Sequence, residues 1–451
     1  MKGEKSMEFK GKKILIMGFA KSGMAAVKLL RHLGADHIIV TDRKDLADKE
    51  LLESWGVTVL KQADELFDED YDLVIKNPGV PYVSPLVKKL TDRNIPVITE
   101  VELAYQVAKP QHYVAITGTN GKTTTTTLVY EFLKEHYGDK ALVGGNIGTP
   151  LCDLVLDYNL LEEEGYYISV ELSQAQLVDI DQFRPDAAAI MNLTPDHVDV
   201  MGSLETYYWS KTLIYKNMKD NDVFVVNADD PVLHEYMEKY PVHCCEKTIS
   251  LYRDDTDGYL KDGWMIINGE KVVELDKVPI PGMHNLQNII VAASACMSVG
   301  VTAEEIRRAV YAFKGVEHRI EFTRELDGVK YYNDSKGTNT DATITALKAF
   351  DRGVILLVGG YEKGLSMDEM KKHLGCVKLV IGYGLAGPRI AHDLVGDAAI
   401  IVEDLVQAVH AAKDAAVPGD IVLLSPTTSS FDQYSGYEER GRHFKKIVNS
   451  L

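Results

Sequence analysis

A glycine- and threonine-rich stretch, ITGTNGKTTTTTL (116–128), holds the residue types that most clearly suggest chemistry. A short apolar run ends in Gly118, and Gly121 is followed by Lys122 and Thr123. The strict phosphate-loop pattern GxxxxGK[ST] fails, because isoleucine occupies its first glycine position. The physical requirements of a phosphate-binding loop are still met, because glycines after a strand let backbone N–H groups converge and a helix N-terminus follows. We expect Lys122 to meet nucleotide phosphates and Thr123 to hold Mg²⁺; the alternative is a glycine turn followed by a helix-capping threonine run.

Three further residues suit a metal site, but each has a plain structural alternative. Glu171 ends the apolar run YYISVEL, at the edge where open α/β sheets bind ligands, and could share the Mg²⁺ of Thr123. A carboxylate that faces water explains the same position equally well. His197 stands between two aspartates in NLTPDHVD, yet a lone histidine is more often structural. Lys211 lies in the helical stretch ETYYWSKTLIY, where a lysine is most often a solvated charge.

The segment GFAKSG (18–23) is a second candidate nucleotide site. It follows an apolar run but reads only G-x-A-x-x-G, because Ala20 replaces the glycine that lets a backbone approach a pyrophosphate. Asp42 follows the next predicted strand. A dinucleotide site, a different nucleotide site and plain packing all remain open from these residues.

Alternating strands and helices must position these side chains. The runs predicted as buried strands are KILIMG (13–18), HIIVTD (37–42), DLVIKNPG (72–79), YVAITG (113–118), YYISVEL (166–172) and AAAIMN (187–192). Helices are predicted over 22–33, 285–298 and 303–313, and β-rich segments such as VFVVN and WMIIN fill 222–275. Further strands, VKYYND, VILLVGG, VKLVIGYG, AAIIVED and DIVLLSP, follow a junction at GVEHR (315–319). This alternation is typical of parallel α/β domains, and we expect three, over residues 1–98, 99–315 and 316–451.

The bulk properties limit the class of protein. The 451 residues exceed a single core, and 45% hydrophobic with 26% charged residues is ordinary for a globular protein. We find no membrane-length apolar run, no signal peptide and no CxxC spacing among the five cysteines, so we expect a cytoplasmic protein without membrane insertion. The net charge of −18 argues against nucleic acid as a partner. An anionic substrate would need a local cluster of Lys and Arg.

A longer series of motifs carries a family resemblance. In chain order these are GTNGKTT, GGNIG (144–148), ELSQAQL (171–177), NLTPDHVD, the segment 207–211, GMHNLQN (282–288), GVEHR, NDSKGTN (333–339), GGYEKG (359–364) and SPTTSSFDQY (425–434). The chain thereby resembles the Mur ligases, ATP-dependent amide-bond synthetases of peptidoglycan precursor assembly, over essentially its whole length after Lys10. The resemblance implies an α/β fold of three domains: a Rossmann-like N-terminal domain that binds a UDP-sugar, a P-loop-type central ATPase domain, and a Rossmann-like C-terminal domain that binds an amino acid. The motifs are most similar to those of the member that adds D-glutamate to UDP-N-acetylmuramoyl-L-alanine through an acyl phosphate, releasing ADP and phosphate.

The resemblance also implies a role for each matching position. The catalytic residues would be Lys122, His197, Lys211 and Lys336. ATP would be bound by Gly118, Thr119, Asn120, Gly121, Lys122, Thr123, Thr124, Asn288, Arg319, Asp334 and Lys336. Two Mg²⁺ ions would be held by Thr123, Glu171, His197 and a carbamylated Lys211. The UDP-sugar would contact Phe19, Ala20, Asp42, Arg43, Asn77, Gly79, Asn146, Gln176 and His197, and the amino acid Thr338, Lys363, Ser430, Phe431 and Tyr437.

One departure from the family pattern and three alternatives are worth testing. The family usually has ELSSFQL where this chain has Gln174 and Ala175, so the contacts of these two positions are open. An NAD-linked oxidoreductase is disfavoured by Ala20, and a non-catalytic nucleotide sensor by cation-rich motifs on separate predicted domains. Folylpolyglutamate synthetase or the L-alanine-adding ligase is disfavoured by ELSxxQL beside a nucleotide-type first domain. The expected partners are UDP-N-acetylmuramoyl-L-alanine and D-glutamate, with a monomeric enzyme.

Overall fold

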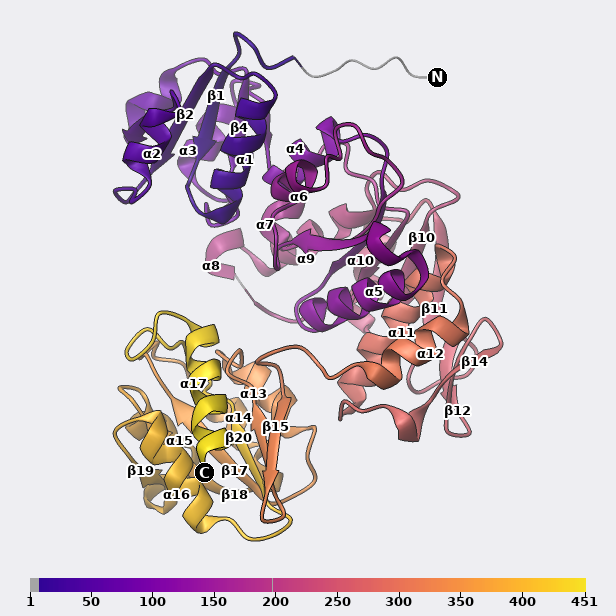
Figure 1. Cartoon of the computed structure of the whole chain (residues 1–451), viewed down its shortest axis with the longest axis vertical. Coiled ribbons are helices and arrows are strands. Elements are labelled where there is room, and N and C mark those ends of the chain that lie inside the picture. The colour runs from indigo at the N-terminus through magenta and orange to yellow at the C-terminus, as the bar shows by residue number, and fades with distance from the viewer. Residues whose placement is uncertain (1–7, 197) are drawn as a thin grey trace. The chain divides into compact units, whose positions relative to one another are not determined.

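The computed structural model, which describes residues 8–196 and 198–451, contains three β-sheets with helices around each (Figure 1). The described residues up to Asp276 form one compact unit together with Gln287–Val310. A second unit comprises Lys277–Leu286 and Tyr311–Leu451. The first two sheets lie in the first unit and the third sheet in the second.

The first sheet is parallel, with strand order β3-β2-β1-β4-β5. Alternate residues of β1 pack into different apolar clusters. Ile14 and Ile16 belong to one cluster, and Leu15 and Met17 belong to the other, so both faces of the sheet are covered. The order reverses between β1 and β4, and a crevice therefore opens at the carboxyl ends of these strands. The elements are β1 Lys13–Met17, α1 Lys21–His32, β2 His37–Asp42, α2 Lys49–Ser54, β3 Thr58–Lys61, β4 Leu73–Lys76, α3 Pro85–Thr91, β5 Val97–Ile98 and α4 Glu100–Val107.

The second sheet has nine strands in the order β14-β13-β12-β11-β10-β9-β6-β8-β7, parallel except for the antiparallel run β12 to β14. Helix α5 packs against β6, β7 and β8. The strands are β6 His112–Thr117, β7 Ala141–Gly145, β8 Tyr167–Glu171, β9 Ala187–Ile190, β10 Val223–Asn227, β11 Cys245–Ile249, β12 Gly258–Lys261, β13 Trp264–Ile267 and β14 Glu270–Glu274. The helices are α5 Lys122–Tyr137, α6 Leu151–Asp157, α7 Gln174–Leu177, α8 Val198–Met201, α9 Leu204–Thr212, α10 Pro231–Lys239, α11 Met283–Ser298 and α12 Ala303–Ala312.

The third sheet has the order β15-β16-β20-β17-β18-β19, and β15 runs antiparallel to the rest. Ile355 and Leu357 of β17 pack toward α16 and α17, whereas Val354 and Leu356 pack toward α13, α14 and α15. The strands are β15 Glu321–Leu326, β16 Val329–Asn333, β17 Val354–Gly359, β18 Val377–Tyr383, β19 Ile400–Ile401 and β20 Ile421–Leu424. The helices are α13 Thr340–Leu347, α14 Asp368–Lys371, α15 Gly387–Val395, α16 Leu405–Ala415 and α17 Tyr437–Ser450.

The predicted strands and helices are all present, with ends that shift by a few residues. The α/β class and the alternation are confirmed, and the three sheets fall within the three predicted ranges. The domain boundaries themselves stay a prediction. Across the described residues, the helices are too short or too polar for any of them to cross a membrane.

Candidate active site

The loop after β6 can adopt its path only because two of its residues are glycines. Gly118 has φ +142°, and a Cβ on it would lie 2.8 Å from Cβ of Met191. Gly121 has φ +82°, and a Cβ there would lie 2.6 Å from Oδ1 of Asn288. Both φ angles lie in the region that favours glycine, and both added atoms would clash. The predicted glycine positions are therefore explained by close backbone approach to two neighbouring segments.

The same loop is hydrogen-bonded to the segment that follows β9. The backbone N–H of Asn120 donates to Oδ1 of Asn192 at 2.9 Å, and Nδ2 of Asn192 donates to the carbonyl of Asn120 at 3.1 Å. The hydroxyl of Thr119 donates to the carbonyl of Thr194 at 3.0 Å. Asn192 and Thr194 belong to the motif NLTPDHVD, in which residue types alone predict no role for these two positions. They hold the glycine loop in place.

Helix α5 begins directly after the loop, as the sequence predicted. Gly121 is its N-cap and contributes no side-chain hydrogen bond, and a helix N-terminus of this kind directs backbone N–H groups and the positive end of the helix dipole toward an anion. The ammonium of Lys122 donates to the carbonyls of Gly118 and Thr119, both at 2.8 Å. Thr123 and Thr124 are buried in the first turn. This arrangement of amides, dipole and ammonium is suited to a phosphate group.

Glu171 ends β8, on the strand next to the one that leads into the loop. Ile116 of β6 and Glu171 are paired in register, so the carboxylate stands at the same sheet edge. One oxygen, Oε1, accepts from Nδ2 of Asn146 at 2.8 Å. The other, Oε2, is buried and has no hydrogen-bond partner within residues 8–196 and 198–451. A buried carboxylate oxygen without a donor is a costly feature that a cation would satisfy.

The motif GGNIG brings Asn146 to this carboxylate. Gly145 has φ +101°, and a Cβ on it would lie 2.4 Å from the carbonyl oxygen of Glu171. A Cβ on Gly144 would lie 2.5 Å from the carbonyl oxygen of Thr149. Gly145 thus lets the chain pass close beside β8, and Gly144 lets it fold back on Thr149.

Lys211 is fully buried, so the prediction of a solvated charge from residue type alone is wrong. Its ammonium donates to the carbonyl of Gly118 at 3.0 Å and stands 4.7 Å from the ring centroid of Tyr207. Burial, and then the nearby charge of Lys122, hold the pKa of Lys211 well below its usual value, against an opposing effect of Asp196 and Glu171. The amine is therefore biased toward its neutral, nucleophilic form. The structure brings it to the same loop as Lys122.

His197, which was predicted to bind metal and substrate, lies outside the described residues. In the described part of the chain, no group of three or more His, Cys, Asp or Glu side chains could hold a metal ion. Magnesium does not need such a cage, because it commonly takes one or two carboxylates and completes its shell with water and substrate phosphates.

Gln176 has a structural partner in the short helix α7. Its Oε1 accepts from the backbone N–H of Ser173 at 2.9 Å, as in a capping box, and also from the Ser173 hydroxyl at 2.9 Å. The two residues that depart from the family pattern, Gln174 and Ala175, are also buried on this helix. Because Oε1 already accepts from Ser173, the predicted contact of Gln176 with a UDP-sugar would use the N–H groups of its side-chain amide as donors.

The carboxyl ends of β1 and β4 enclose a pocket of about 210 Å³ in the first sheet. The backbone N–H of Phe19 donates to Oδ2 of Asp42 at 2.7 Å, and Oδ1 of Asn77 accepts from the N–H of Gly79 at 3.0 Å. Nδ2 of Asn77 is buried without a hydrogen-bond partner among the described residues. Five of the predicted UDP-sugar residues line this pocket, namely Phe19, Asp42, Arg43, Asn77 and Gly79. Ala20 lines an adjoining hollow that it shares with Phe19 and Asp42.

In the second unit, Asp334 stands just past the end of β16. Its side chain is buried, and this raises the pKa of the Asp334 carboxyl to about 7, against the hydrogen bond from Ser425 and the charge of Arg319. The Ser425 hydroxyl donates to Oδ2 of Asp334 at 2.6 Å. A Cβ on Gly337 would lie 2.4 Å from this same oxygen, so the NDSKG turn needs its glycine. The ammonium of Lys336 lies 5.2 Å from the ring centroid of Tyr437.

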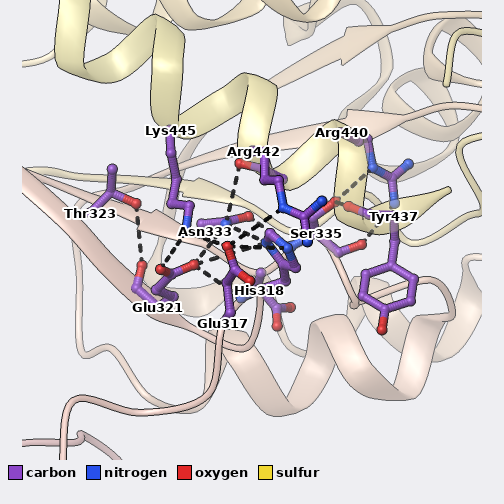
Figure 2. A network of polar contacts seen from close by, with 12 residues as sticks. Glu317, His318, Glu321, Thr323, Asn333, Ser335, Tyr437, Arg440, Arg442 and Lys445 are labelled. Atoms are coloured by element: carbon purple, nitrogen blue, oxygen red, sulfur yellow. Dashed lines mark hydrogen bonds and ion pairs between the residues drawn. The ribbon is translucent and has the colours of Figure 1, made fainter. Parts of the chain in front are cut away.

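Arg440, for which the sequence predicts no role in the site, joins two of the predicted motifs. Figure 2 shows its guanidinium beside Ser335: Nε donates to the Ser335 hydroxyl at 3.0 Å and an Nη to the Ser335 carbonyl at 2.8 Å. Both Nη atoms also donate to the carbonyl of Thr428 at 3.3 Å. The Ser335 hydroxyl in turn donates to the carbonyl of Tyr437 at 2.8 Å. The fully buried Arg440 therefore ties the turn NDSKG to the loop SPTTSS.

His318 lies in the same network (Figure 2). It has φ +67°, is buried, and its Nδ1 stands 2.9 Å from Nδ2 of Asn333. Because an amide nitrogen only donates, Nδ1 accepts and the neutral ring carries its proton on Nε2. Burial lowers the pKa of His318, which favours that neutral form. The next residue, Arg319, is anchored through its backbone N–H to the carbonyl of Val316 at 3.1 Å.

Four of the five predicted amino-acid residues stand on loops at the carboxyl edge of the third sheet, and the fifth, Tyr437, begins α17. The ammonium of Lys363, after β17, donates to the carbonyl of Thr338 at 3.3 Å. Burial and the charge of Arg440 lower the pKa of Lys363. Ser430 is buried after β20, and the side chain of Phe431 is exposed. The structure thus brings Lys363 and Thr338 together, and their contact with an amino acid stays a prediction.

Comparison with known proteins identifies the class to which this fold and site belong. The Mur ligase middle domain family matches residues 116–296, and the Mur ligase, glutamate ligase domain family matches residues 318–428. The chain belongs to the Mur ligase family. The UDP-N-acetylmuramoylalanine--D-glutamate ligase of Geobacillus kaustophilus (strain HTA426) is 40% identical to it over 453 residues, 98% of each chain. The protein of the same name from Bacillus cereus (strain AH820) is 39% identical over 98% of this chain and 99% of its own.

Solved structures of more distant relatives share the fold. The UDP-N-acetylmuramate-alanine ligase MurC of Thermotoga maritima is 20% identical, with a TM-score of 0.58 over 97% of this chain and 99% of its own. The MurF ligase of Thermotoga maritima, in complex with ADP, is 19% identical, with a TM-score of 0.59 over 99% and 97%. The predicted family and three-domain α/β architecture are confirmed.

Proposed function

We propose that this chain is the ATP-dependent ligase that joins D-glutamate to UDP-N-acetylmuramoyl-L-alanine and releases ADP and phosphate, a step in peptidoglycan precursor synthesis. Full-length identity of about 40% to ligases of that name carries this proposal. The geometry supports the ATP chemistry independently, because a glycine loop, a lysine and an uncapped helix N-terminus converge after β6.

The reaction must first activate a carboxylate. Transfer of the γ-phosphoryl group of ATP makes an acyl phosphate, which the amine of the amino acid then attacks. Charge spreads over the phosphoryl oxygens in this transfer, so catalysis consists mainly of positioning and of cations. Lys122 would stabilise that charge from the loop, together with the amides of the first turn of α5.

The residues around Glu171 fit a magnesium ion. Glu171 offers its unpartnered Oε2, and the hydroxyl of Thr123 supplies a second oxygen at the helix start. Bound there, Mg²⁺ would neutralise phosphate charge and let two anions approach each other. Two such ions were expected from the sequence, and both remain proposals.

Lys211 would serve as a carbamate. Its neutral amine can attack CO₂ to form an N–C bond and lose a proton to solvent, which turns a cation into a carboxylate-like ligand. The buried position and the lowered pKa support this proposal, because an ammonium there would repel both Lys122 and a metal ion. Asp196 and Glu171 favour the charged amine, and carbamylation must compete with them.

The remaining predicted roles are proposed in the same way. The pocket of the first sheet would take the uridine, with Asp42 and Asn77 as hydrogen-bonding groups. Asn146 and Gln176 would contact the sugar portion, and Lys363 and Thr338 a carboxylate of D-glutamate. The three ranges 1–98, 99–315 and 316–451 would serve the UDP-sugar, ATP and the amino acid. Asn288, Arg319, Asp334 and Lys336 keep their proposed contacts with the nucleotide. We propose a cytoplasmic monomer, because ATP and UDP-sugars are cytoplasmic solutes.

Phosphate release tests the function directly. Purified protein should release phosphate from ATP and Mg²⁺ only when UDP-N-acetylmuramoyl-L-alanine and D-glutamate are both present, and the product mass should equal their condensation. L-alanine with UDP-N-acetylmuramate is the competing pair, for the ligase that adds L-alanine. Preference for that pair, or turnover without ATP, would overturn the proposal.

A further inference from the structure

A buried ion pair inside the first unit links the last strand residue of β4 to the segment that follows α7. Lys76, the last residue of β4, is fully buried, and its ammonium lies 2.9 Å from Oδ2 of Asp179. The side chain of Asp179 is only 11% exposed. The ammonium also lies 3.5 Å from the carbonyl of Val80. A buried lysine is costly unless it is paired, so the Asp179 carboxylate compensates the burial of Lys76 and ties the two segments together.

Both partners adjoin segments that were assigned to the site for other reasons. Lys76 immediately precedes Asn77, which lines the pocket of the first sheet. Asp179 follows α7, the helix that carries Gln176 and comes directly after Glu171. The ion pair therefore connects the wall of the uridine pocket to the edge of the phosphoryl-transfer site.

A second contact runs from the loop that follows β4 to helix α9. The rings of Tyr82 and Trp209 are 6.4 Å apart between centroids, and Trp209 stands two residues before Lys211. The neighbouring Val83 packs so closely on Gly202 that a Cβ on that glycine would lie 2.6 Å from Cγ1 of Val83. The end of β4 and the loop after it thus contact two segments of the central range, the one that follows α7 and the one formed by α9 and the residues before it.

We propose that Lys76 and Asp179 are positioning residues that hold the uridine pocket at a fixed separation from the phosphoryl-transfer site, an inference that rests on the proposed function. One substrate molecule must place its uracil in the pocket and its carboxylate at the γ-phosphate. A misplacement of about 1 Å in such a geometry can lower the rate by about a hundredfold. Neither side chain needs to touch the substrate, because each acts through Asn77 or α7.

The test separates binding at each end from alignment between the ends. In Asp179→Asn, and in the double variant Lys76→Met with Asp179→Asn, kcat at saturating substrates should fall at least about tenfold. The Kd of UDP, which fills only the pocket, and that of ADP, which fills only the ATP site, should each change less than about twofold, because the groups that bind them are intact. The double variant leaves no unpaired buried charge, so its unfolding midpoint should exceed that of Asp179→Asn.

Asp222→Asn is the matched control. Asp222 is also a buried aspartate, paired with Arg184 at 2.7 Å, but both partners belong to the central range and no pocket residue adjoins them. It should lower the unfolding midpoint and leave kcat unchanged.

Each outcome decides the inference. Wild-type kcat in Asp179→Asn and in the double variant would overturn it, and so would a tenfold loss of UDP or ADP binding, which would mean that the pair acts on one pocket alone. If neither variant folds, Asp179→Glu keeps the charge and displaces the carboxylate by one methylene, and unchanged kcat there would overturn the inference. If the wild-type protein makes no product with UDP-N-acetylmuramoyl-L-alanine and D-glutamate, the proposed function itself is wrong.

Discussion

Replacement of Lys211 distinguishes a carbamate ligand from a structural lysine. Lys211→Ala should lower kcat at least about a hundredfold, because even residues that only orient a metal ligand are worth about 10- to 100-fold. The substitution removes the aliphatic stem and the amine, a space that acetate fills approximately with a methyl and a carboxylate. Acetate should therefore restore part of the activity of Lys211→Ala. Lys211→Met keeps that space filled and should not be rescued.

In the absence of CO₂ and metal, the protonation of Lys211 sets the size of its contribution to the pH dependence of the free energy of unfolding. Its pKa in the folded chain lies well below the ordinary value of 10.5, because of burial and then of Lys122. Between these two pKa values the unfolded chain holds one proton more than the folded chain, so the free energy of unfolding rises with pH. The slope from this group is at most about 1.4 kcal/mol per pH unit. The stability is lost as the pH falls toward the lowered pKa, and Lys211→Met removes this dependence.

The measurement is urea unfolding between pH 7 and 10 in nitrogen-purged buffer with EDTA, on wild type and Lys211→Met. The wild-type unfolding free energy should rise more steeply with pH, by up to the stated slope. Addition of ¹³C-bicarbonate should then give a carbamate signal in the wild-type NMR spectrum that is absent from Lys211→Met. Equal slopes together with no carbamate signal would refute the reasoning, and so would full activity of Lys211→Ala.

Other substitutions test the loop, the nucleotide contact and the amino-acid site. Gly121→Ala should cost about 1–2 kcal/mol of stability from its φ alone and should also weaken ADP binding in calorimetry, because its Cβ would strike Asn288. Gly263→Ala, at φ +77° with nothing within 4 Å, is the control that should lose stability but not ADP binding. Lys363→Ala should lower kcat/KM for D-glutamate about 10- to 100-fold, since a charged hydrogen bond contributes about 1.5–3 kcal/mol; an unchanged value would make Lys363 a loop residue. The raised pKa of Asp334, about 7 against 3.8, means that the folded chain holds an extra proton between these values, so stability falls as pH rises through that window. Asp334→Asn should reduce this decrease of the thermal unfolding midpoint with rising pH. A pH dependence equal to that of the wild type would contradict the assignment to Asp334.

The phosphate loop was predictable because its chemistry is local. Glycines, a lysine and a helix start lie within a few residues of one another, and the structure places Gly118, Gly121 and Lys122 as expected. The position of Glu171 was predictable for a related reason, because a residue at the end of a parallel strand must stand at the ligand-binding edge. Its pairing in register with Ile116 confirms that placement.

Other features depend on contacts between distant segments, which residue type alone does not reveal. The carboxamide of Asn192 binds the backbone of Asn120 across 72 residues of chain, and the pattern NLTPDHVD gives no local sign of it. Arg440 lies in YEERGRHFKK, where alternating charges are typical of an exposed helix face. Short edge strands such as β3 and β5 lack a long apolar run, and their pairing with neighbours decides their structure.

Three fully buried cations differ in how their charge is compensated, and this difference indicates their roles. Lys76 faces a carboxylate, and Arg440 donates to carbonyls and a hydroxyl. Lys211 donates to one carbonyl and lies over a ring, and the nearby Lys122 disfavours its charge, without an ion pair in the described part of the chain. The first two have partners that compensate their charge and are suited to hold segments together. Burial and then Lys122 lower the pKa of Lys211, so this lysine is suited to lose its proton and react with CO₂.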